Sequence, residues 1–349
     1  MRALVTGASG FIGSYVVERL LARGVSVRAM ARDARAAQYL KNWPVEIVYG
    51  DLATGLGLED ACHGVQVVFH VAALYSLERR HQRAMYETNV GGTQRLLAAI
   101  RRSPTVERVV YTSSTAAVGL RPDGEPADES WEVDPRTLPD GYKRSKVLAE
   151  HVVREAAREG LDVVIVNPST PIGARDVKPT PTGATIRDAA LGRMPAYVDT
   201  GLNWVAVQDV AEGHLLAWEK GQRGERYILG HENLTLRQLL ERIERLTGVK
   251  APRLRIPLGV AMTVAYADEL VWSRLWRRPP RAPIAGVELA KRRMFYSPAR
   301  AVRELGMPQT SLDQALIEAV EWFQRLAQVD PSDPHGRQAS PPGKKRGTL

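Results

Sequence analysis

The sequence predicts an α/β fold, in which a doubly wound parallel sheet carries a smaller, mainly helical cap. Short β-branched runs alternate with helix-like stretches through the first 167 residues. A glycine-rich turn separates the first of these runs from the first helix-like stretch. After Asn167 the alternation stops, and prolines and glycines punctuate the chain. Successive strand–helix–strand units build a parallel sheet with helices on both faces, so the change after Asn167 marks a second region.

Each strand expected in the first half is an apolar run without polar alternation, which is typical of strands buried on both faces of a sheet. The runs cover residues 3–6, 25–30, 45–49, 67–70, 108–112 and 163–167. Helix-like stretches lie between them at residues 11–23, 93–102 and 142–158.

The second half predicts further strands at residues 204–207 and 227–229, with a helix at 210–220 between them. Three amphipathic stretches predict cap helices at residues 236–247, 260–276 and 312–326. We therefore expect one domain of residues 1–167 plus about 202–230, and a cap of about 168–201 plus 231–328. Residues 329–349 lack an apolar anchor and are expected to form a flexible tail.

The composition is that of a globular protein: 349 residues, 44% hydrophobic and 25% charged. This excludes a disordered chain. No apolar run approaches the ~20 residues that cross a bilayer, and the amino terminus lacks the apolar core of a signal peptide. Cys62 is the single cysteine and cannot form an internal disulfide. A cytoplasmic location is therefore expected.

The net charge of +9 is concentrated in residues 274–300, where eight basic side chains face one acidic one. A solvated face, an anionic substrate or an anionic membrane surface explains such a patch, and nucleic acid is not expected. Trp272 and Trp276 precede several of these arginines, which suggests either peripheral membrane contact or ordinary packing in the cap. The histidines are too scattered for a metal site, and none is expected.

Gly7, Gly10 and Gly13 lie between the first strand and the first helix, together with Ser9, Phe11 and Ile12. In this position the first glycine permits a tight turn, the second lets backbone N–H groups approach a pyrophosphate, and the third lets helix and strand pack closely. The diphosphate then lies at the positive end of the helix. The pattern predicts a Rossmann-type dinucleotide site.

The end of the second strand indicates which dinucleotide is bound. An acidic residue there would bind the ribose 2′-hydroxyl of NAD, whereas this stretch carries Arg28 and Arg32. Guanidinium groups hold a 2′-phosphate, so NADP(H) is favoured over NAD(H). Asp33 is the alternative that would reach a ribose hydroxyl. Asp51, followed by Leu52, is either an adenine ligand or an ordinary loop acid.

Tyr142 and Lys146 lie four residues apart, on one face of an expected helix. A phenol with a pKa near 10 is a poor base at neutral pH. An ammonium group about 4 Å away, at an effective dielectric of ~20, contributes about 4 kcal/mol, which lowers a phenol pKa by roughly three units. The spacing therefore predicts Tyr142 as a proton carrier with a lowered pKa.

Ser114 follows the fifth strand, at the edge where an open α/β sheet binds its ligands. Its hydroxyl is predicted to hold the substrate oxygen, with Ser113 as the alternative. Asn89 is expected either to hold a neighbouring helix in place or to support a water chain to Lys146.

Together these residues resemble the extended short-chain dehydrogenase/reductase superfamily over roughly residues 1–326. The motifs are Thr6-Gly7-x-x-Gly10-Phe11-Ile12-Gly13, Asp51-Leu52, His70-Val71-Ala72-Ala73, Asn89-Val90-x-Gly92-Thr93, Ser113-Ser114, Tyr142-x-x-x-Lys146 and Val207-x-Asp209-Val210. The resemblance implies that Ser114, Tyr142 and Lys146 are catalytic. It also implies that Val71, Ala72, Ala73, Ser113 and Pro168 join the cofactor site, and that Lys146 binds the nicotinamide ribose.

A narrower likeness is carried by four further segments, Asn167-Pro168-Ser169-Thr170-Pro171-Ile172-Gly173, Lys178-Pro179-Thr180-Pro181-Thr182-Gly183, Gly192-Arg193-Met194-Pro195-Ala196-Tyr197-Val198 and Gly224-Glu225-Arg226-Tyr227-Ile228-Leu229-Gly230. These segments are similar to those of hopanoid-associated sugar epimerases, relatives of the dihydroflavonol reductases. The likeness implies a sugar or polyol substrate, either free or presented by a lipid. The family resemblance also implies a homodimer formed through helices 93–102 and 142–158.

Substrate contacts are expected between the sheet edge and the cap, from Tyr75, Ser169, Lys178, Tyr197 and Asn203. Two reactions use the same residues. An epimerase oxidises a carbinol and returns the hydride to the other face, whereas a reductase of ketones or aldehydes performs only the second half. A non-catalytic NADP-binding protein is a third hypothesis, which the complete set of Ser114, Tyr142 and Lys146 disfavours.

Overall fold

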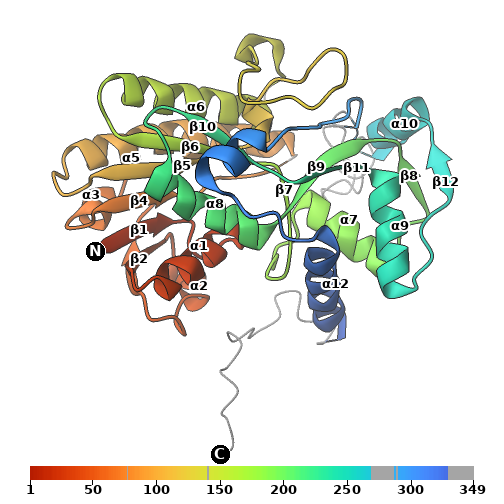
Figure 1. Ribbon diagram of the computed structural model, residues 1–349, viewed down its shortest axis with the longest axis horizontal. Helices are drawn as coiled ribbons and strands as arrows, with labels where there is room; N and C mark the ends of the chain where they lie inside the picture. Colours follow the sequence, from red (N-terminus) through yellow and green to blue (C-terminus); the bar gives the residue numbers. More distant parts are fainter. Residues whose placement is uncertain (77, 140, 269–286, 288–289, 329–349) are drawn as a thin grey trace, which may run out of the picture.

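Seven parallel strands form the central sheet of the computed structural model, which describes residues 1–76, 78–139, 141–268, 287 and 290–328 (Figure 1). They are β1 (Arg2–Thr6), β2 (Ser26–Ala31), β3 (Glu46–Tyr49), β4 (Val67–His70), β5 (Arg108–Thr112), β6 (Val163–Pro168) and β10 (Arg226–Leu229). Their order is β10-β6-β5-β4-β1-β2-β3, so the chain changes direction across the sheet between β1 and β4. The predicted fold class is confirmed, and each strand expected in this sheet lies within one residue of its observed bounds.

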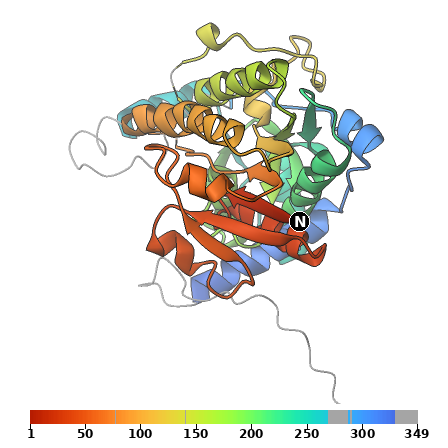
Figure 2. The same ribbon diagram turned by 90° about the vertical axis from the view of Figure 1, so that its left-hand side faces the viewer.

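Helices cover both faces of this sheet (Figure 2). One face carries α1 (Phe11–Ala22) and α8 (Val207–Lys220), and the other carries α3 (Leu58–Cys62), α5 (Gly92–Arg101) and α6 (Tyr142–Arg158). Shorter helical segments are α2 (Ala34–Gln38), η1 (Arg79–His81), α4 (Gln82–Tyr86), η2 (Glu87–Gly91), η3 (Thr115–Ala117) and η4 (Pro135–Thr137).

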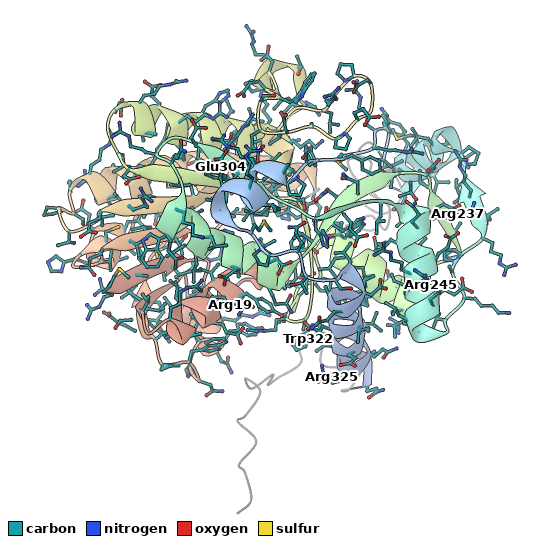
Figure 3. All side chains as sticks on the ribbon, in the orientation of Figure 1. Arg19, Arg237, Arg245, Glu304, Trp322 and Arg325 are labelled. Atoms are coloured by element: carbon teal, nitrogen blue, oxygen red, sulfur yellow. The ribbon has the colours of Figure 1, made fainter. Side chains whose placement is uncertain are left out.

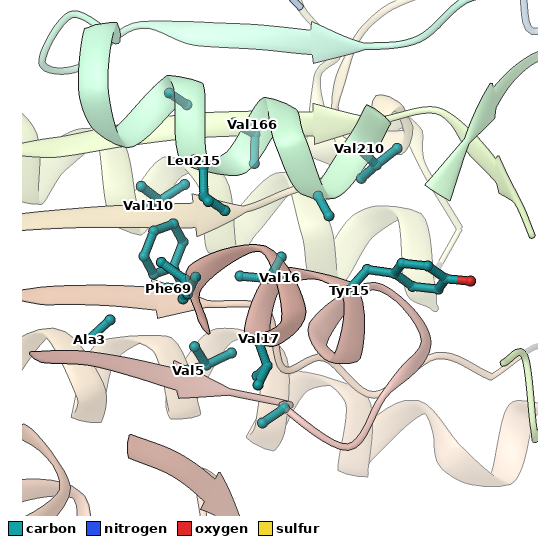
Figure 4. Packing of buried hydrophobic residues seen from close by; sticks show 14 of the residues in the cluster. Ala3, Val5, Tyr15, Val16, Val17, Phe69, Val110, Val166, Val210 and Leu215 are labelled. Carbon is teal, nitrogen blue, oxygen red and sulfur yellow. The ribbon is translucent and has the colours of Figure 1, made fainter. Parts of the chain in front are cut away.

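The sheet is apolar on both faces because it is buried on both faces. All four residues of β4 and all six of β6 are buried. Figure 4 shows Val16 of α1 and Leu215 of α8 packed near Phe69 of β4 and Val110 of β5. This packing explains why apolar runs without alternation predicted these strands.

The cap contains two small sheets besides its helices. β7 (Thr170–Ile172), β9 (Gly201–Ala206) and β11 (Glu232–Thr235) form the first, and β8 (Ala196–Val198) pairs with β12 (Leu254–Ile256) in the second. Its helices are α7 (Pro181–Ala190), α9 (Leu236–Thr247), α10 (Leu258–Asp268) and α12 (Leu312–Gln328). The strand expected at residues 204–207 corresponds to β9, but the other four strands of the cap were missed, because runs of three or four residues carry little periodicity.

Helix α9 shows why the cap helices could be predicted. A capping box of Thr235 and Gln238 starts it. Leu239 and Ile243 are buried against the cap core, whereas Arg237 and Arg245 lie on its outer side (Figure 3). This separation of apolar and charged faces is the amphipathic pattern read from the sequence.

One segment returns from the cap to the sheet. The π-helical turn η6 (Ala301–Leu305) packs on α8 and β10, and Ala301, Leu305 and Met307 join the core around α1 and α8. The expected domain division placed this segment in the cap.

Parts of several expectations lie outside the described residues. These are the end of the 260–276 helix, most of the basic patch at 274–300 with Trp272 and Trp276, and the tail 329–349. Within the part of the chain that is described, no helix is long and apolar enough to cross a membrane.

Candidate active site

The turn between β1 and α1 brings the backbone of two strands close together. Gly7 has a φ of 68°, and a Cβ on it would lie 2.8 Å from the backbone of Ala72. A Cβ on Gly13 would lie 2.0 Å from the Gly7 carbonyl oxygen. Both positions therefore require glycine, the first for its φ and the second for space.

The start of α1 fits an anionic group. Gly10 caps the helix without a side-chain hydrogen bond, and no acidic residue lies in the first turn. Backbone N–H groups at this end carry partial positive charge and point along the helix axis. The turn therefore fits the pyrophosphate of a dinucleotide.

A cavity of about 790 Å³ runs from this turn, past the carboxyl ends of β1, β4 and β5, to the cap. Most residues that the sequence assigned to the dinucleotide line it. They are Gly7, Ser9, Gly10, Phe11, Ile12, Gly13, Arg32, Asp51, Leu52, Val71, Ala72, Ala73, Ser113, Tyr142, Lys146 and Pro168.

Arg28 does not line the cavity, and its assignment to a 2′-phosphate was wrong. Its side chain is buried beside α3, where its Nη1 donates to the carbonyl oxygens of Asp60, Ala61 and His63, and its Nη2 pairs with Glu46 at 3.0 Å. Successive side chains of a strand point to opposite faces, and Arg28 points into the helical layer rather than toward the strand end.

Arg32 comes just after β2 and does line the cavity, with its side chain 72% exposed. Asp33, the alternative ribose ligand, accepts the Ala36 N–H at the start of α2 and pairs with Arg32 at 3.4 Å. These contacts hold the pKa of Asp33 below its usual value, with the backbone hydrogen bond as the main cause. Asp51 uses its Oδ1 to accept the Ala53 N–H.

Ser114, Tyr142 and Lys146 meet on one wall of the cavity, where η3 follows β5 and α6 begins. The Ser114 Oγ accepts the Ala116 N–H, which leaves its own proton free to donate. Lys146 is 2% exposed, and its Nζ donates to the Thr112 carbonyl oxygen at 2.7 Å.

The electrostatics of this wall differ from the sequence prediction. Burial raises the pKa of Tyr142 to about 12, against the opposite effect of its side-chain hydrogen bond with Ser114. Burial lowers the pKa of Lys146 to about 8, partly offset by the charge of Glu150. The predicted lowering of the phenol pKa was wrong, because desolvation dominates and the Lys146 amine is directed at Thr112. At neutral pH the phenol is therefore a proton donor.

Asn89 does not line the cavity. Its Oδ1 accepts the Leu74 N–H at 2.7 Å, and its Nδ2 donates to the Leu74 carbonyl and to the Ser145 Oγ. The Ser145 hydroxyl in turn donates to the Tyr142 carbonyl. Asn89 was expected either to hold a neighbouring helix in place or to support a water chain to Lys146, and these contacts favour the first role.

A directed chain of hydrogen bonds joins the strand ends behind the site. The Thr93 hydroxyl donates to the Asn89 carbonyl, so it accepts the Nε2–H of His70. The His70 Nδ1 then accepts the Thr6 hydroxyl, whose oxygen accepts the Ala72 N–H. The neutral ring of His70 thus fixes the loop that follows β4 against β1 and α5.

Toward the cap, the cavity is lined by Tyr75, Ser169, Lys178 and Asn203 among the expected substrate residues. The Tyr75 ring meets the Tyr142 ring edge-on, with centroids 4.4 Å apart. The Ser169 Oγ is buried without a hydrogen-bond partner among the described residues. Tyr197 does not line the cavity. It packs in the cap core, so its assignment to substrate was wrong.

Several residues of the cavity wall were not predicted from the sequence, and those contributed by distant segments include Leu202, Met294 and Tyr296. The chain after residue 290 crosses the site and pairs with β9 through Leu202 and Met294. The Tyr296 hydroxyl donates to the Thr115 carbonyl, which fixes the loop behind Ser114. No local sequence pattern predicts these contacts, because they join segments about 90 or more residues apart.

Known proteins are similar to this chain over most of its length. The model of the NAD dependent epimerase/dehydratase family matches residues 3–230. The chain is 47% identical over 329 residues to a Synechocystis protein named putative dihydroflavonol 4-reductase, covering 93% of this chain and 95% of that one. It is 40% identical over 331 residues to sterol demethylase protein B of Methylococcus capsulatus, covering 94% and 100%. Among solved structures, PA4631 of Pseudomonas aeruginosa, described as a nucleoside-diphosphate-sugar epimerase, superposes with a TM-score of 0.77 at 28% identity, covering 93% and 98%.

Proposed function

The chain belongs to the NAD dependent epimerase/dehydratase family of extended short-chain dehydrogenases/reductases, and from this premise we propose that it is an NADP(H)-dependent reductase of a ketone or aldehyde. The main support for carbonyl reduction is the buried phenol of Tyr142, which stays protonated at neutral pH beside the Ser114 hydroxyl. A protonated phenol supplies the proton that carbonyl reduction consumes.

Each residue of this wall has one task. Ser114 donates a hydrogen bond to the carbonyl oxygen and orients it. Tyr142 donates its proton to the same oxygen as the carbonyl becomes an alcohol. Lys146 places positive charge near the phenolate that remains. The dinucleotide supplies the hydride, so one carbonyl, one hydride and one proton give one alcohol.

The proposed cofactor preference rests on the end of β2. Arg32 lines the cavity there, whereas Asp33 is engaged by α2 and by Arg32 itself. A guanidinium group binds a 2′-phosphate, and a carboxylate would repel it.

The proposed substrate is largely apolar. The cap end of the cavity is lined by Leu74, Pro171, Leu202 and Met294, with Lys178 as its cation in the described part of the chain. Apolar walls with a few convergent hydroxyl groups suit a compact carbocyclic or isoprenoid ketone. The names of the dihydroflavonol reductase and sterol demethylase relatives support this substrate class.

Epimerisation of a sugar or polyol is the second candidate, in the manner of the hopanoid-associated sugar epimerases. The similarity to PA4631 favours it, and Lys178 could bind a substrate phosphate. Tyr142 would then act first as base and afterwards as acid. A cytoplasmic homodimer that touches an anionic membrane also remains a proposal.

Turnover separates the two reactions. The enzyme is incubated with NADPH or NADH and a panel of steroid, terpenoid and flavonoid ketones, and in parallel with nucleotide sugars. Reductase activity consumes reduced nicotinamide in proportion to alcohol formed, with NADPH preferred. Formation of an epimer without net change in the nicotinamide would replace this proposal with the second candidate.

A further inference from the structure

A buried carboxylate lies directly behind the proposed catalytic wall. Glu150 is 2% exposed and lies on α6 one turn after Lys146 and two turns after Tyr142, at a spacing that keeps the three on one side of the helix. Glu150 does not line the cavity, so it does not touch the substrate or the dinucleotide.

Within the described part of the chain, the Glu150 carboxylate contacts hydrogen-bond donors and cations. Its Oε2 accepts the Ser113 hydroxyl at 2.5 Å and the Asn167 Nδ2–H at 2.8 Å. Its Oε1 accepts the Arg226 Nη1–H at 3.0 Å and lies 3.3 Å from the Arg154 Nη2. A carboxyl group surrounded only by donors and cations is held as the anion.

These contacts reach the substrate-binding serine from two directions. The Asn167 amide that binds Glu150 also donates to the Ser114 carbonyl at 2.9 Å. Arg226 binds the carbonyl oxygens of Ala117 and Trp131, on either side of the loop that follows Ser114. Glu150 is thus the point where β5, β6, β10 and α6 are tied together behind the site; these elements lie side by side in Figure 1.

We propose that Glu150 is a positioning residue of this site: its carboxylate is the counter-charge of the Lys146 ammonium and holds the end of β5 that carries Ser113 and Ser114. The proposal rests on the proposed hydride transfer, because that reaction uses Lys146 as a cation.

Among the described residues, the other titratable groups that face Lys146 are neutral, so Glu150 is its counter-charge. His70 of β4 is neutral, since burial lowers its pKa to about 3. Tyr111 of β5 has its ring 5.1 Å from the Lys146 Nζ, and burial raises its pKa well above the usual value, so it is neutral too. Tyr142 is protonated. The Glu150 charge acts to raise the pKa of Lys146 against the effect of burial.

The two cations that face Glu150 also pair with a second carboxylate, that of Glu132. Arg226 lies 3.3 Å from Glu132, and Arg154 lies 2.8 Å from the same carboxylate. Arg154 is 22% exposed, whereas Arg226 is 3% exposed. When the Glu150 charge is lost, the positive charges of Arg154 and Arg226 are less neutralised near Lys146. Their repulsion then disfavours protonation of Lys146 further.

The test titrates Lys146 by NMR in protein carrying ¹³C-labelled lysine, without substrate, with Lys146→Met used for assignment. In Glu150→Gln the midpoint for Lys146 is expected to fall by about one pH unit. Glu155→Gln is the matched control, since Glu155 lies on the same helix in an exposed pair with Arg158, and it should leave the midpoint unchanged. An unmoved midpoint in folded Glu150→Gln overturns the proposal.

Glu150→Gln removes one of the two carboxylate partners of the buried Arg226 guanidinium and is expected to be less stable, so a second variant is included. Arg154→Gln removes a cation beside Glu150 at a position that is less buried than Arg226, and it should raise the Lys146 midpoint by about 0.3 pH unit. Shifts of opposite sign in the two variants are not expected of a structural role alone. If Glu150→Gln does not fold, absence of the upward shift in Arg154→Gln overturns the proposal.

Kinetics give the corresponding readout in the active enzyme. The alkaline limb of the kcat profile should move down by the same one unit in Glu150→Gln, which lowers kcat about fivefold at pH 8 and about tenfold above pH 9, with little change in KM for the dinucleotide. A wild-type protein that transfers no hydride overturns the proposed function alone, because the NMR titration needs neither substrate nor turnover.

Discussion

Burial decides the protonation of the reactive side chains. Pairing with an ammonium group would have lowered the pKa of Tyr142, but desolvation raises it, because the phenol lies in the cavity wall and Lys146 is turned to the Thr112 carbonyl. The same desolvation weakens Lys146 as a base. The site is therefore built from a neutral acid and a cation that is easily discharged, which suits donation of a proton to a developing alkoxide.

The low pKa of Lys146 has a consequence for stability. Its folded pKa of about 8 lies below the unfolded value of 10.5. Between these values the unfolded chain binds a proton that the folded chain does not, so Lys146 contributes increasing stability as pH rises through this window. Compared with Lys146→Met, the wild type should gain roughly 2–3 kcal/mol in unfolding free energy between pH 8 and 10. Denaturant titrations measure this difference.

Lys41→Met, at an exposed position, is the control, and its difference from wild type should stay flat with pH. A flat difference for Lys146→Met as well would show that its ammonium is not disfavoured by burial.

Strand ends and helix starts are joined by polar side chains of fixed direction. His70 links β4 to β1 and α5. His214 of α8 donates its Nδ1–H to the Val210 carbonyl, so its Nε2 accepts the Thr112 hydroxyl of β5. Both rings must be neutral to make these bonds, and burial lowers the pKa of His70 to about 3 and of His214 to about 4.

These two histidines predict a loss of stability in mild acid. Their folded pKa values lie below the unfolded value of 6.5, so the unfolded chain binds protons that the folded chain excludes as pH falls through 6.5 toward 4. Each should cost roughly 1–2 kcal/mol of unfolding free energy between pH 6.5 and 5. In His214→Gln the slope of stability against pH should be about half that of the wild type, and in the exposed-site control His63→Gln it should be unchanged. Equal slopes in all three proteins would contradict the neutral, buried rings.

The β1–α1 turn predicts a second element-scale effect. Gly13→Ala places a methyl group 2.0 Å from the Gly7 carbonyl oxygen, so the turn must open. We expect a loss of about 1–3 kcal/mol of stability and a severe loss of dinucleotide binding. Gly259→Ala is the control in α10, where a Cβ meets nothing within 4 Å, and it should be neutral or slightly stabilising. Dinucleotide fluorescence titration and thermal unfolding measure both effects, and normal binding by Gly13→Ala would be inconsistent with a pyrophosphate in this turn.

At the scale of the whole molecule, the cavity lies where the sheet's carboxyl edge meets the cap. Local patterns predicted the sheet because each strand is an uninterrupted apolar run. They predicted the cavity's dinucleotide end because the glycine-rich turn directly follows β1 and the carboxyl ends of parallel strands meet at one edge of the sheet. They could not predict Met294 and Tyr296, which reach the site through bridges to β9 and Ala127. They also could not predict the raised pKa of Tyr142, because burial is a property of the folded chain.

Dinucleotide binding should stabilise the whole fold, since the ligand binds the folded state. At equal concentrations NADP⁺ is expected to raise Tm more than NAD⁺, because Arg32 lines the cavity where the 2′-phosphate would lie. Arg32→Ser should remove this difference, and Arg35→Ser, an exposed arginine on α2, should retain it. A larger Tm shift with NAD⁺ in the wild type would reverse the proposed preference.

Transfer of deuterium from [4-²H]NADPH to a ketone tests hydride exchange at this wall most directly. With an accepted ketone, wild-type enzyme should give an alcohol carrying one deuterium on the carbinol carbon, as read by mass spectrometry. Tyr142→Phe should bind NADPH normally and form that alcohol about 10³-fold more slowly, because it has lost its proton donor. Deuterated alcohol formed at the wild-type rate by Tyr142→Phe would contradict the account.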